Sequence, residues 1–383
     1  MKPIQPIKPI KPPYQPGLYV HVPFCKTKCP YCDFYSVTDL SCVESWLDSI
    51  EREMELYEAD FGAFDSLYIG GGTPTVLEDE QIDRLMAALR RRFFFLPDSE
   101  ITVEANPDDV RAEKLEVLRR LGANRISIGV QSFNERELRF LRRRHTAEQA
   151  EEAVRLAKGC GFSNIGIDLM YGFCGQTKKS WAETLEKAVS LGPLHLSCYQ
   201  FTLEERTPYG RLKAEGKLKM IGEEKERALF LFTSRFLKQC GFIHYEVSNF
   251  AKGAHGFSRH NRKYWQHVPY LGLGPAAHSF RGRTRWWNCR SVDEYCRLLG
   301  QGKRPVEGRE DLSPDQLRLE RLYLGFRTDG GVSAAEACRD DAAARTVSRL
   351  KRSGFLKVVG DRLIPTEKGF LIADRLPLMF VGK

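Results

Sequence analysis

The sequence predicts an α/β protein that has a parallel sheet and a smaller second unit. From residue 18 to about residue 200, apolar segments typical of strands alternate with amphipathic stretches typical of helices, several of them closed by a glycine. Six β/α units in a row indicate parallel strands with helices outside, as a partial barrel or a doubly wound sheet. Residues 301–383 predict a small helical unit with a hairpin around Gly360 and Asp361, which resembles a winged helix.

The individual elements follow from hydrophobic periodicity. The strand candidates are 18–22, 66–69, 100–104, 125–131, 164–169 and 195–200. The helix candidates are 43–57, 79–95, 109–121, 134–144, 146–159, 178–191 and 222–239. Ser41 and Glu44 have the spacing of a capping box, which predicts that Cys42 lies in the first turn of the first helix.

We expect four parts along the chain. They are a Pro-rich N-terminal tail (1–16), a core of six β/α units (17–205), an extension (206–300) and the winged-helix-like unit (301–383). The tail is a Pro-Ile-Lys pseudo-repeat that cannot pack a core, so we expect it to be extended.

Composition narrows the class of protein. Hydrophobic residues make up 42% of the chain and charged residues 28%, which is typical of a globular protein. No apolar run approaches the ~20 residues of a membrane span. Eleven cysteines, an odd number and mostly scattered, argue against a disulfide framework and for a reducing cytoplasm. No secretory leader is expected. The net charge of +9 fits a solvated basic face, and the C-terminal basic residues form no aromatic-interleaved stripe, so we expect no nucleic acid partner.

Three cysteines follow the first predicted strand at C-x3-C-x2-C spacing: Cys25, Cys29 and Cys32. A cubane iron–sulfur cluster usually takes four cysteines, so three would leave one iron open to a small molecule. Zinc is the alternative, but it prefers four ligands, commonly in two pairs, and the chain has no second C-x2-C pair.

Polar or glycine residues stand at the end of nearly every predicted strand. They are Gly70, Gly71, Gly72 and Thr73 after the second strand, Glu104, Gln131, Asp168, and Tyr199 with Gln200. Taken singly, each of these residues could be explained by a helix cap or a turn. Together they favour a ligand site beyond the carboxyl ends of the strands, where parallel α/β proteins bind ligands.

The cysteine loop and the phrases GGGTPT, VEANP, GVQSF and YEVSNFA resemble the radical S-adenosylmethionine (radical SAM) superfamily. They are most similar to the branch that holds oxygen-independent coproporphyrinogen III dehydrogenases and HemW-type haem chaperones. The resemblance runs from about residue 17 to the C-terminus. It implies a partial (β/α)6 TIM-like barrel with a winged-helix-like C-terminal unit.

The resemblance also implies a role for each motif residue. Cys25, Cys29 and Cys32 would ligate a [4Fe-4S] cluster whose open iron is chelated by S-adenosylmethionine, which such enzymes cleave reductively. The residues that would hold S-adenosylmethionine are Tyr31 at the adenine, Gly71, Gly72 and Thr73 at the methionine amino end, Glu104, Gln131 and Asp168 around the methionine and ribose, and Arg143 at the carboxylate. For Arg143, an ordinary basic helix end is the alternative.

Two departures bear on activity. The dehydrogenases usually carry a fourth cysteine two positions after the third, where this chain has Phe34, and they have a longer N-terminal segment. Cys174 stands where relatives commonly show a proline, and we interpret it as a tolerated loop substitution, with a thiolate contact to cluster or haem as the minor alternative. Phe34 disfavours dehydrogenase activity, while the sequence leaves open whether S-adenosylmethionine is cleaved or only bound.

The run from His260 to Trp265 matches the H-N-x-x-Y-W motif of HemW-type chaperones, whose histidine is the implied haem contact. Imidazole is a common haem ligand, and Tyr264 and Trp265 could offer flat apolar surface, while the propionates could pair with Arg259, Arg262 and Lys263. A packed structural histidine is the alternative. The other histidines nearby in sequence are His244, His255, His267 and His278.

These observations favour a haem chaperone over a coproporphyrinogen III dehydrogenase. The expected cargo is haem, delivered to respiratory haem-protein acceptors that could lie at the membrane surface. We expect a cytoplasmic protein, which could associate peripherally with the membrane, and an electron donor for the cluster. A homodimer is one of the oligomeric states open to it.

Overall fold

The computed structural model describes residues 15–380, so residues 1–14 of the expected N-terminal tail lie outside the described part. Within it, twelve strands form one sheet in the order β12-β11-β10-β9-β1-β2-β3-β4-β5-β6-β8-β7. The central strands pair in parallel and in chain order, as the sequence predicts: β1 (Gly17–Val22), β2 (Phe64–Gly71), β3 (Phe95–Ala105), β4 (Arg125–Gln131), β5 (Asn164–Tyr171) and β6 (His195–Gln200).

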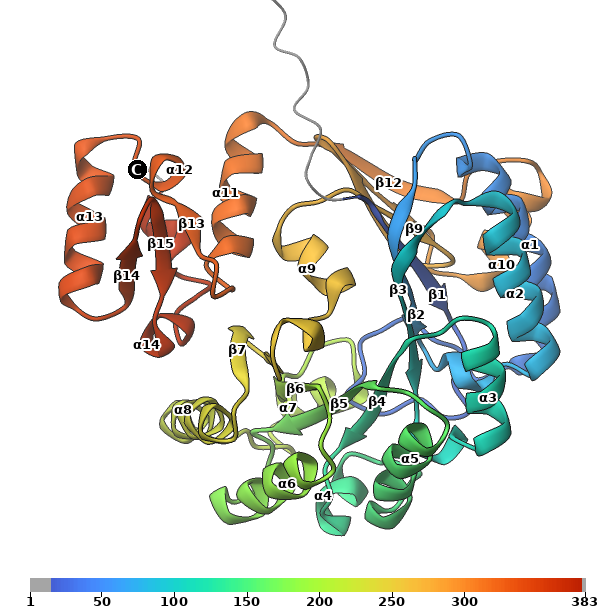
Figure 1. Ribbon diagram of the computed structural model, residues 1–383, viewed down its shortest axis with the longest axis horizontal. Helices are drawn as coiled ribbons and strands as arrows, with labels where there is room; N and C mark the ends of the chain where they lie inside the picture. Colours follow the sequence, from blue (N-terminus) through green and yellow to red (C-terminus); the bar gives the residue numbers. More distant parts are fainter. Residues whose placement is uncertain (1–14, 381–383) are drawn as a thin grey trace, which may run out of the picture.

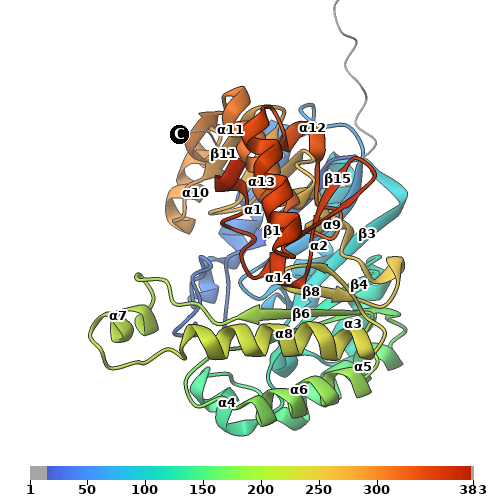
Figure 2. The same ribbon diagram turned by 90° about the vertical axis from the view of Figure 1, so that its left-hand side faces the viewer.

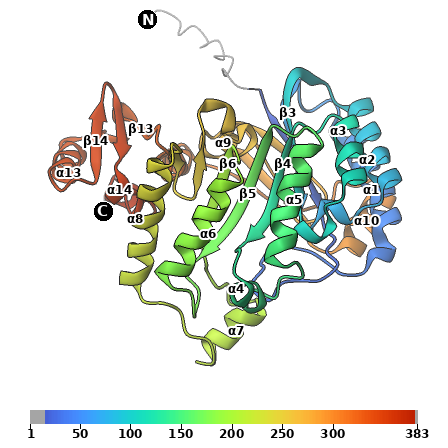
Figure 3. The same ribbon diagram turned by 60° about the horizontal axis from the view of Figure 1, so that its bottom comes forward.

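A layer of helices covers the convex face of this sheet (Figure 3). The helices are α1 (Val43–Tyr57), α2 (Asp79–Arg92), α3 (Ala112–Arg120), α4 (Glu135–Phe140), α5 (Ala147–Gly159), α6 (Lys178–Ser190), α8 (Glu223–Gln239) and α10 (Val292–Gly300). In α1, the fully buried Trp46, Ile50 and Met54 repeat every four residues and form the face toward the strands. Trp46 meets Phe24, which follows β1, edge to face at 5.6 Å.

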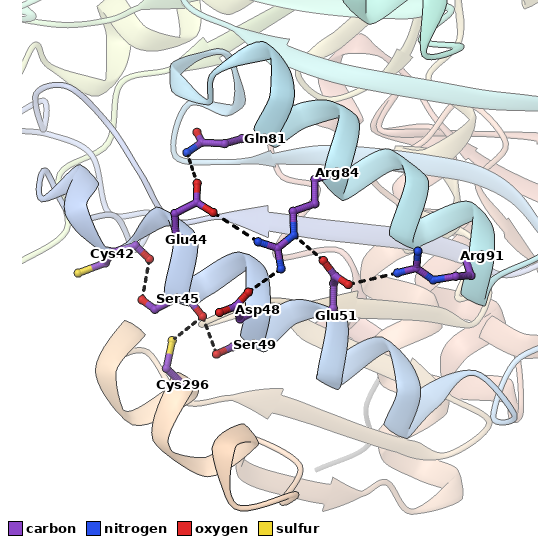
Figure 4. Close-up of polar contacts among 10 residues, drawn as sticks. All are labelled: Cys42, Glu44, Ser45, Asp48, Ser49, Glu51, Gln81, Arg84, Arg91 and Cys296. Atoms are coloured by element: carbon purple, nitrogen blue, oxygen red, sulfur yellow. Dashed lines mark hydrogen bonds and ion pairs between the residues drawn. The ribbon is translucent and has the colours of Figure 1, made fainter.

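The start of α1 differs from the predicted capping box. A single 3₁₀ turn (Leu40–Cys42) precedes the helix and is capped by Asp39, which accepts a hydrogen bond from the backbone N–H of Ser41. Cys42 is the N-cap of α1, without a side-chain cap bond. Glu44 instead faces α2, where it accepts a 2.6 Å hydrogen bond from Gln81 and lies 3.4 Å from Arg84 (Figure 4). Tertiary ion pairing therefore replaces the local cap.

The extension, together with β12 just after it, supplies both edges of the sheet, which stays open instead of closing into a barrel. On one side β9 (Tyr270–Leu273) runs parallel to β1, and β10 (His278–Arg281), β11 (Thr284–Asn288) and β12 (Val306–Asp311) continue antiparallel. On the other side lie β8 (Asn249–Ala251) and β7 (Ile243–Glu246). Helix α9 (Arg259–Trp265) lies inside the curve, between the strands and the C-terminal unit (Figure 1).

The C-terminal unit has the helix and strand order of a winged helix. It comprises α11 (Pro314–Gly325), β13 (Val332–Ser333), α12 (Ala334–Ala337), α13 (Asp341–Arg352), β14 (Leu356–Val359), β15 (Arg362–Pro365) and α14 (Glu367–Phe370). The hairpin predicted at Gly360 joins β14 and β15. β12 belongs to the large sheet, although it falls within 301–383. No helix in residues 15–380 has the length and apolar character to span a bilayer.

Candidate functional site

The loop between β1 and α1 carries the three cysteines. A pair of backbone hydrogen bonds closes it at its base, Cys25 N to Val37 O (3.0 Å) and Val37 N to Pro23 O (2.8 Å). The three thiols are unpaired and half-buried. Among residues 15–380, no three His, Cys, Asp or Glu side chains converge on a single point, and this holds for the three cysteines as well.

A chain of polar contacts ties this loop to the carboxyl ends of the neighbouring strands. The Cys25 thiol lies 3.4 Å from the Thr73 hydroxyl, which accepts a 3.0 Å hydrogen bond from Asn106 Nδ2. Asn106 Oδ1 in turn accepts a 2.6 Å hydrogen bond from Arg143, whose second nitrogen lies 3.6 Å from Cys29 Sγ. Two cysteines are thus linked through β2, β3 and the segment after α4.

Arg143 is the cation of this arrangement. It also donates to the carbonyl oxygen of Gly129 at 2.7 Å, yet its buried Nε–H has no partner in the part of the chain described. A buried guanidinium with an unused donor is costly unless an anion completes it. The three thiols fit an iron–sulfur cluster that has one open iron. Arg143, beside them, fits a ligand that carries a carboxylate.

Gly71, which ends β2, and Gly72 pack closely against the cysteine loop. The backbone N–H groups of Gly72 and Thr73 donate to the carbonyl oxygens of Val22 (2.8 Å) and Phe24 (2.7 Å). A Cβ on Gly72 would lie 2.5 Å from the Phe24 oxygen, and Gly71 has a φ of +102°. These residues hold the cysteine loop against β2 by close backbone packing.

Glu104 and Asp168 are half-buried, each with partners from the protein. Glu104 accepts hydrogen bonds from the Tyr68 hydroxyl (2.6 Å) and from Gly71 N (3.1 Å), and burial raises its pKa to about 7. Asp168 accepts one from Ser127 (3.1 Å), and burial raises its pKa too. The Glu104 carboxyl can therefore be neutral or charged near pH 7 according to what lies above it.

Gln131 ends β4 in a strained conformation. Its φ is +67°, a left-handed value that is uncommon outside glycine and typical of functional sites. A Cβ built on Gly129 would lie 3.0 Å from Gln131 Nε2 and 3.5 Å from both Arg143 and Asn106. The expected residues Gln131 and Arg143 therefore come together, and Asn106 joins them. Its place after Glu104-Ala105 is the one signal that could have identified Asn106.

An apolar cluster lies against the other side of the loop. Tyr31 meets Phe201 edge to face at 5.8 Å, and Tyr209 N donates to Pro30 O at 3.0 Å. Arg206 forms a two-pronged ion pair with Asp33. These partners come from the segment before and within α7 (Pro208–Ala214), which projects from the body (Figure 2). No pattern in the sequence indicated them.

His260 lies at the opposite, amino-terminal end of the strands. It is buried, with Nδ1 3.0 Å from the hydroxyl of Ser66 in β2 and Nε2 2.9 Å from that of Tyr264. Burial lowers its pKa to about 3, so the ring is neutral. A haem iron could bind it only if one of these hydrogen bonds broke. Trp265 is half-buried and points elsewhere, into a cleft beside α9.

Two further residues of interest are exposed. The Phe34 ring, at the position of the fourth cysteine, is 68% exposed, and Cys174 is an exposed free thiol.

A model of the radical SAM superfamily matches residues 19–188. The heme chaperone HemW of Mycobacterium tuberculosis is 35% identical over 99% of this chain and 98% of its own length. The Bacillus subtilis HemW is 37% identical over 95% of this chain and 99% of its own length. The Escherichia coli HemW is 36% identical over 96% of this chain and 98% of its own length.

Among solved structures, coproporphyrinogen III oxidase (HemN) from Escherichia coli, a radical SAM enzyme, superimposes with a TM-score of 0.81. It is 27% identical and covers 96% of this chain and 90% of that chain. The fold, the cysteine loop and the full-length relatives agree. The chain belongs to the HemW family of the radical SAM superfamily.

Proposed function

We propose that the protein is a haem chaperone with a radical SAM core, which binds haem, a [4Fe-4S] cluster and S-adenosylmethionine. The observation that carries this proposal is the similarity to HemW chaperones over at least 95% of both chains in three bacteria. It includes the extension and the C-terminal unit, which lie beyond residues 19–188 of the superfamily match.

In this proposal, the cysteine loop holds the cluster and the strand ends hold S-adenosylmethionine. Cys25, Cys29 and Cys32 would hold three irons of the cluster and leave the fourth open to S-adenosylmethionine. When bound, the cluster supplies one electron for reductive cleavage of the sulfonium. Arg143 neutralises the methionine carboxylate, and Tyr31, within the apolar cluster, covers the adenine and limits access of water.

The remaining proposed S-adenosylmethionine contacts have supporting roles. Thr73 orients Cys25, while Gly71 and Gly72 fix the loop against β2. Gln131 lies beside Arg143, and Glu104 and Asp168 provide two carboxyls whose pKa values burial raises.

The delivery step is also part of the proposal. Haem passes to respiratory haem-protein acceptors, in the cytoplasm or at the membrane surface, and a separate donor reduces the cluster. A homodimer is the oligomeric state that we would test first.

The second candidate is oxidative decarboxylation of coproporphyrinogen III, which the structural similarity to HemN favours. Phe34 argues against it. Its exposed ring holds the position where we expect such enzymes to carry a further cysteine.

One anaerobic experiment separates the two candidates. The reconstituted protein is incubated with reductant, S-adenosylmethionine and coproporphyrinogen III, and the same preparation is titrated with haem. We expect stoichiometric haem binding and no protoporphyrinogen. Catalytic formation of protoporphyrinogen, or no haem binding, would overturn the proposal.

A further inference from the structure

Buried polar side chains line the inner face of the sheet, opposite the helix layer, near the start of β4. The parallel register places Thr102 of β3 beside Arg125 of β4, and it places Gly166 of β5 between Ser127 and His195. Side chains in register on neighbouring strands share one face, so these residues form one cluster. The cluster lies toward the amino-terminal ends of the strands, away from the cysteine loop.

Arg125 is a buried cation without a counter-ion in direct contact. It is 1% exposed, its Nε and Nη1 have no hydrogen-bond partner among residues 15–380, and it forms no ion pair there. The carboxylates that attract it, Glu100 and Asp168, are already engaged. Glu100 accepts two backbone N–H groups at the start of α9, and Asp168 accepts the hydroxyl of Ser127. Burial of a guanidinium in this way is costly unless an anion completes it.

His195 supplies a second buried donor to the cluster. Its Nε2 lies 2.7 Å from the hydroxyl of Tyr245, which accepts a 3.3 Å hydrogen bond from the backbone N–H of Ser258. Burial raises the pKa of Tyr245, so the hydroxyl keeps its proton and donates it to Nε2. Burial lowers the pKa of His195, so the ring is neutral and its one proton is on Nδ1. That Nδ1 has no partner in the part of the chain described.

The unused donors face the same point above Gly166. A Cβ on this glycine would lie 3.1 Å from Ser127 Oγ, 3.2 Å from Arg125 Nη2 and 3.6 Å from His195 Nδ1. The buried hydroxyl of Thr102, on the other side of Arg125, is also without a partner among residues 15–380. Such close packing admits only a guest of a few atoms. A water molecule would bring two hydrogens that need acceptors, whereas a carboxylate or a halide only accepts.

We propose that Arg125 and His195 bind a small monovalent anion, a carboxylate or a halide, on the inner face of the sheet beside Gly166. One uncompensated cation calls for one negative charge, and the N–H groups supply the hydrogen bonds. The inference goes beyond the proposed haem function and does not depend on it, because the site shares no residue with the cysteine loop or with α9.

Crystals of the full-length protein grown in sodium bromide test the site directly. Data collected at the bromine absorption edge should show an anomalous peak within hydrogen-bonding distance of Arg125 and His195. Crystals grown in sodium formate should show planar density at the same place, which separates a carboxylate from a halide. Ordered water there in both salts, with bromide only at other positions, would overturn the inference.

Thermal unfolding tests the site in solution. A ligand that binds only the folded state should raise the Tm of the wild type by about 1–3 °C for each tenfold rise in bromide or formate above its Kd. Arg125→Met removes the cation and should lack this gain, whereas Arg139→Met, at an exposed arginine of α4, should keep it. General salt effects act on all three proteins, so the difference between them reports the site.

A second variant covers the case in which Arg125→Met does not fold. His195→Gln keeps a polar group within reach of Tyr245 and removes the Nδ1 donor, so it should weaken anion binding about tenfold. An equal gain in Tm for the wild type and for each folded variant, or no gain in the wild type, would contradict the site.

Discussion

The two ends of the central strands are filled in opposite ways. At the carboxyl ends, Arg143 and the three cysteines carry groups that the protein leaves incompletely bonded. At the amino ends, α9 fills the space, and His260 has partners for both ring nitrogens. The unused donor of Arg143 fits a ligand site, and the complete pairing of His260 fits a packing role for α9, although the buried Arg125 at the start of β4 also leaves Nε and one terminal nitrogen without a partner. A motif match alone does not separate these cases.

The largest effect is expected at the cysteine loop. The triple variant C25A/C29A/C32A should lose all cluster iron and sulfide after anaerobic reconstitution, because it removes all three thiols of the loop. Its far-UV circular dichroism should match the wild type, since the thiols lie outside the buried core. Substituting Cys42, Cys240 and Cys338 together is the control and should retain iron. Retention of iron by the triple variant C25A/C29A/C32A would contradict a cluster site at the carboxyl ends of the strands.

The next effect concerns the buried cation. Arg143→Met should weaken S-adenosylmethionine binding by roughly 10- to 100-fold, because a charge-assisted carboxylate contact is worth about 1.5–3 kcal/mol. Isothermal titration under anaerobic conditions measures this. Arg139→Ala changes an exposed arginine of α4 and serves as control. Equal affinity of the two variants would remove Arg143 from the site.

A pH effect is expected at Glu53, a fully paired carboxyl outside both regions. It accepts hydrogen bonds from Tyr295, Asn288 and Gly274, and burial raises its pKa to about 7. A carboxyl whose folded pKa exceeds its unfolded value stabilises the fold fully below pH ~4.5, and the gain is lost as the pH rises to about 7. Urea denaturation should show this loss, of the order of 3 kcal/mol.

Glu53→Gln is the matched variant for this effect. It keeps the size of the side chain and cannot ionise, so the free energy of unfolding should change less between pH 4.5 and 7. An unchanged slope would show that other groups determine the pH dependence.

The smallest effect is expected at His260 in α9, at the amino-terminal ends of the strands. His260→Ala should lower the free energy of unfolding by about 1–3 kcal/mol, because it leaves the hydroxyls of Ser66 and Tyr264 without their partner. Cluster content and S-adenosylmethionine affinity should stay unchanged. His255→Ala, at an exposed position, should cost less than about 0.5 kcal/mol. If both variants are equally stable, His260 does not stabilise the packing of α9 against the strands.

Periodicity predicted the strands and the outer helices because these depend on local sequence. The range 43–57 predicted for α1 matches the structure, and all six parallel strands lie where expected. The residues at the strand ends were also predictable, since parallel strands bring their carboxyl ends to one edge.

Contacts between distant segments were not predictable. Asn106 links Thr73 to Arg143 only once three strands are aligned, and Ser66 meets His260 across 194 residues of chain. The capping box failed for the same reason, since Glu44 pairs with a second helix. Spacing in sequence does not say which face of a helix turns inward, so the two faces of α9 could not be separated.

The central claim is that the three-cysteine loop holds a cluster whose fourth iron is open to S-adenosylmethionine. Anaerobic EPR of the dithionite-reduced protein, with iron and sulfide analysis, tests it most directly. We predict about four irons and four sulfides per chain and a [4Fe-4S]⁺ signal whose g values change when S-adenosylmethionine is added. Bound zinc, or a cluster signal that S-adenosylmethionine leaves unchanged, would contradict the account.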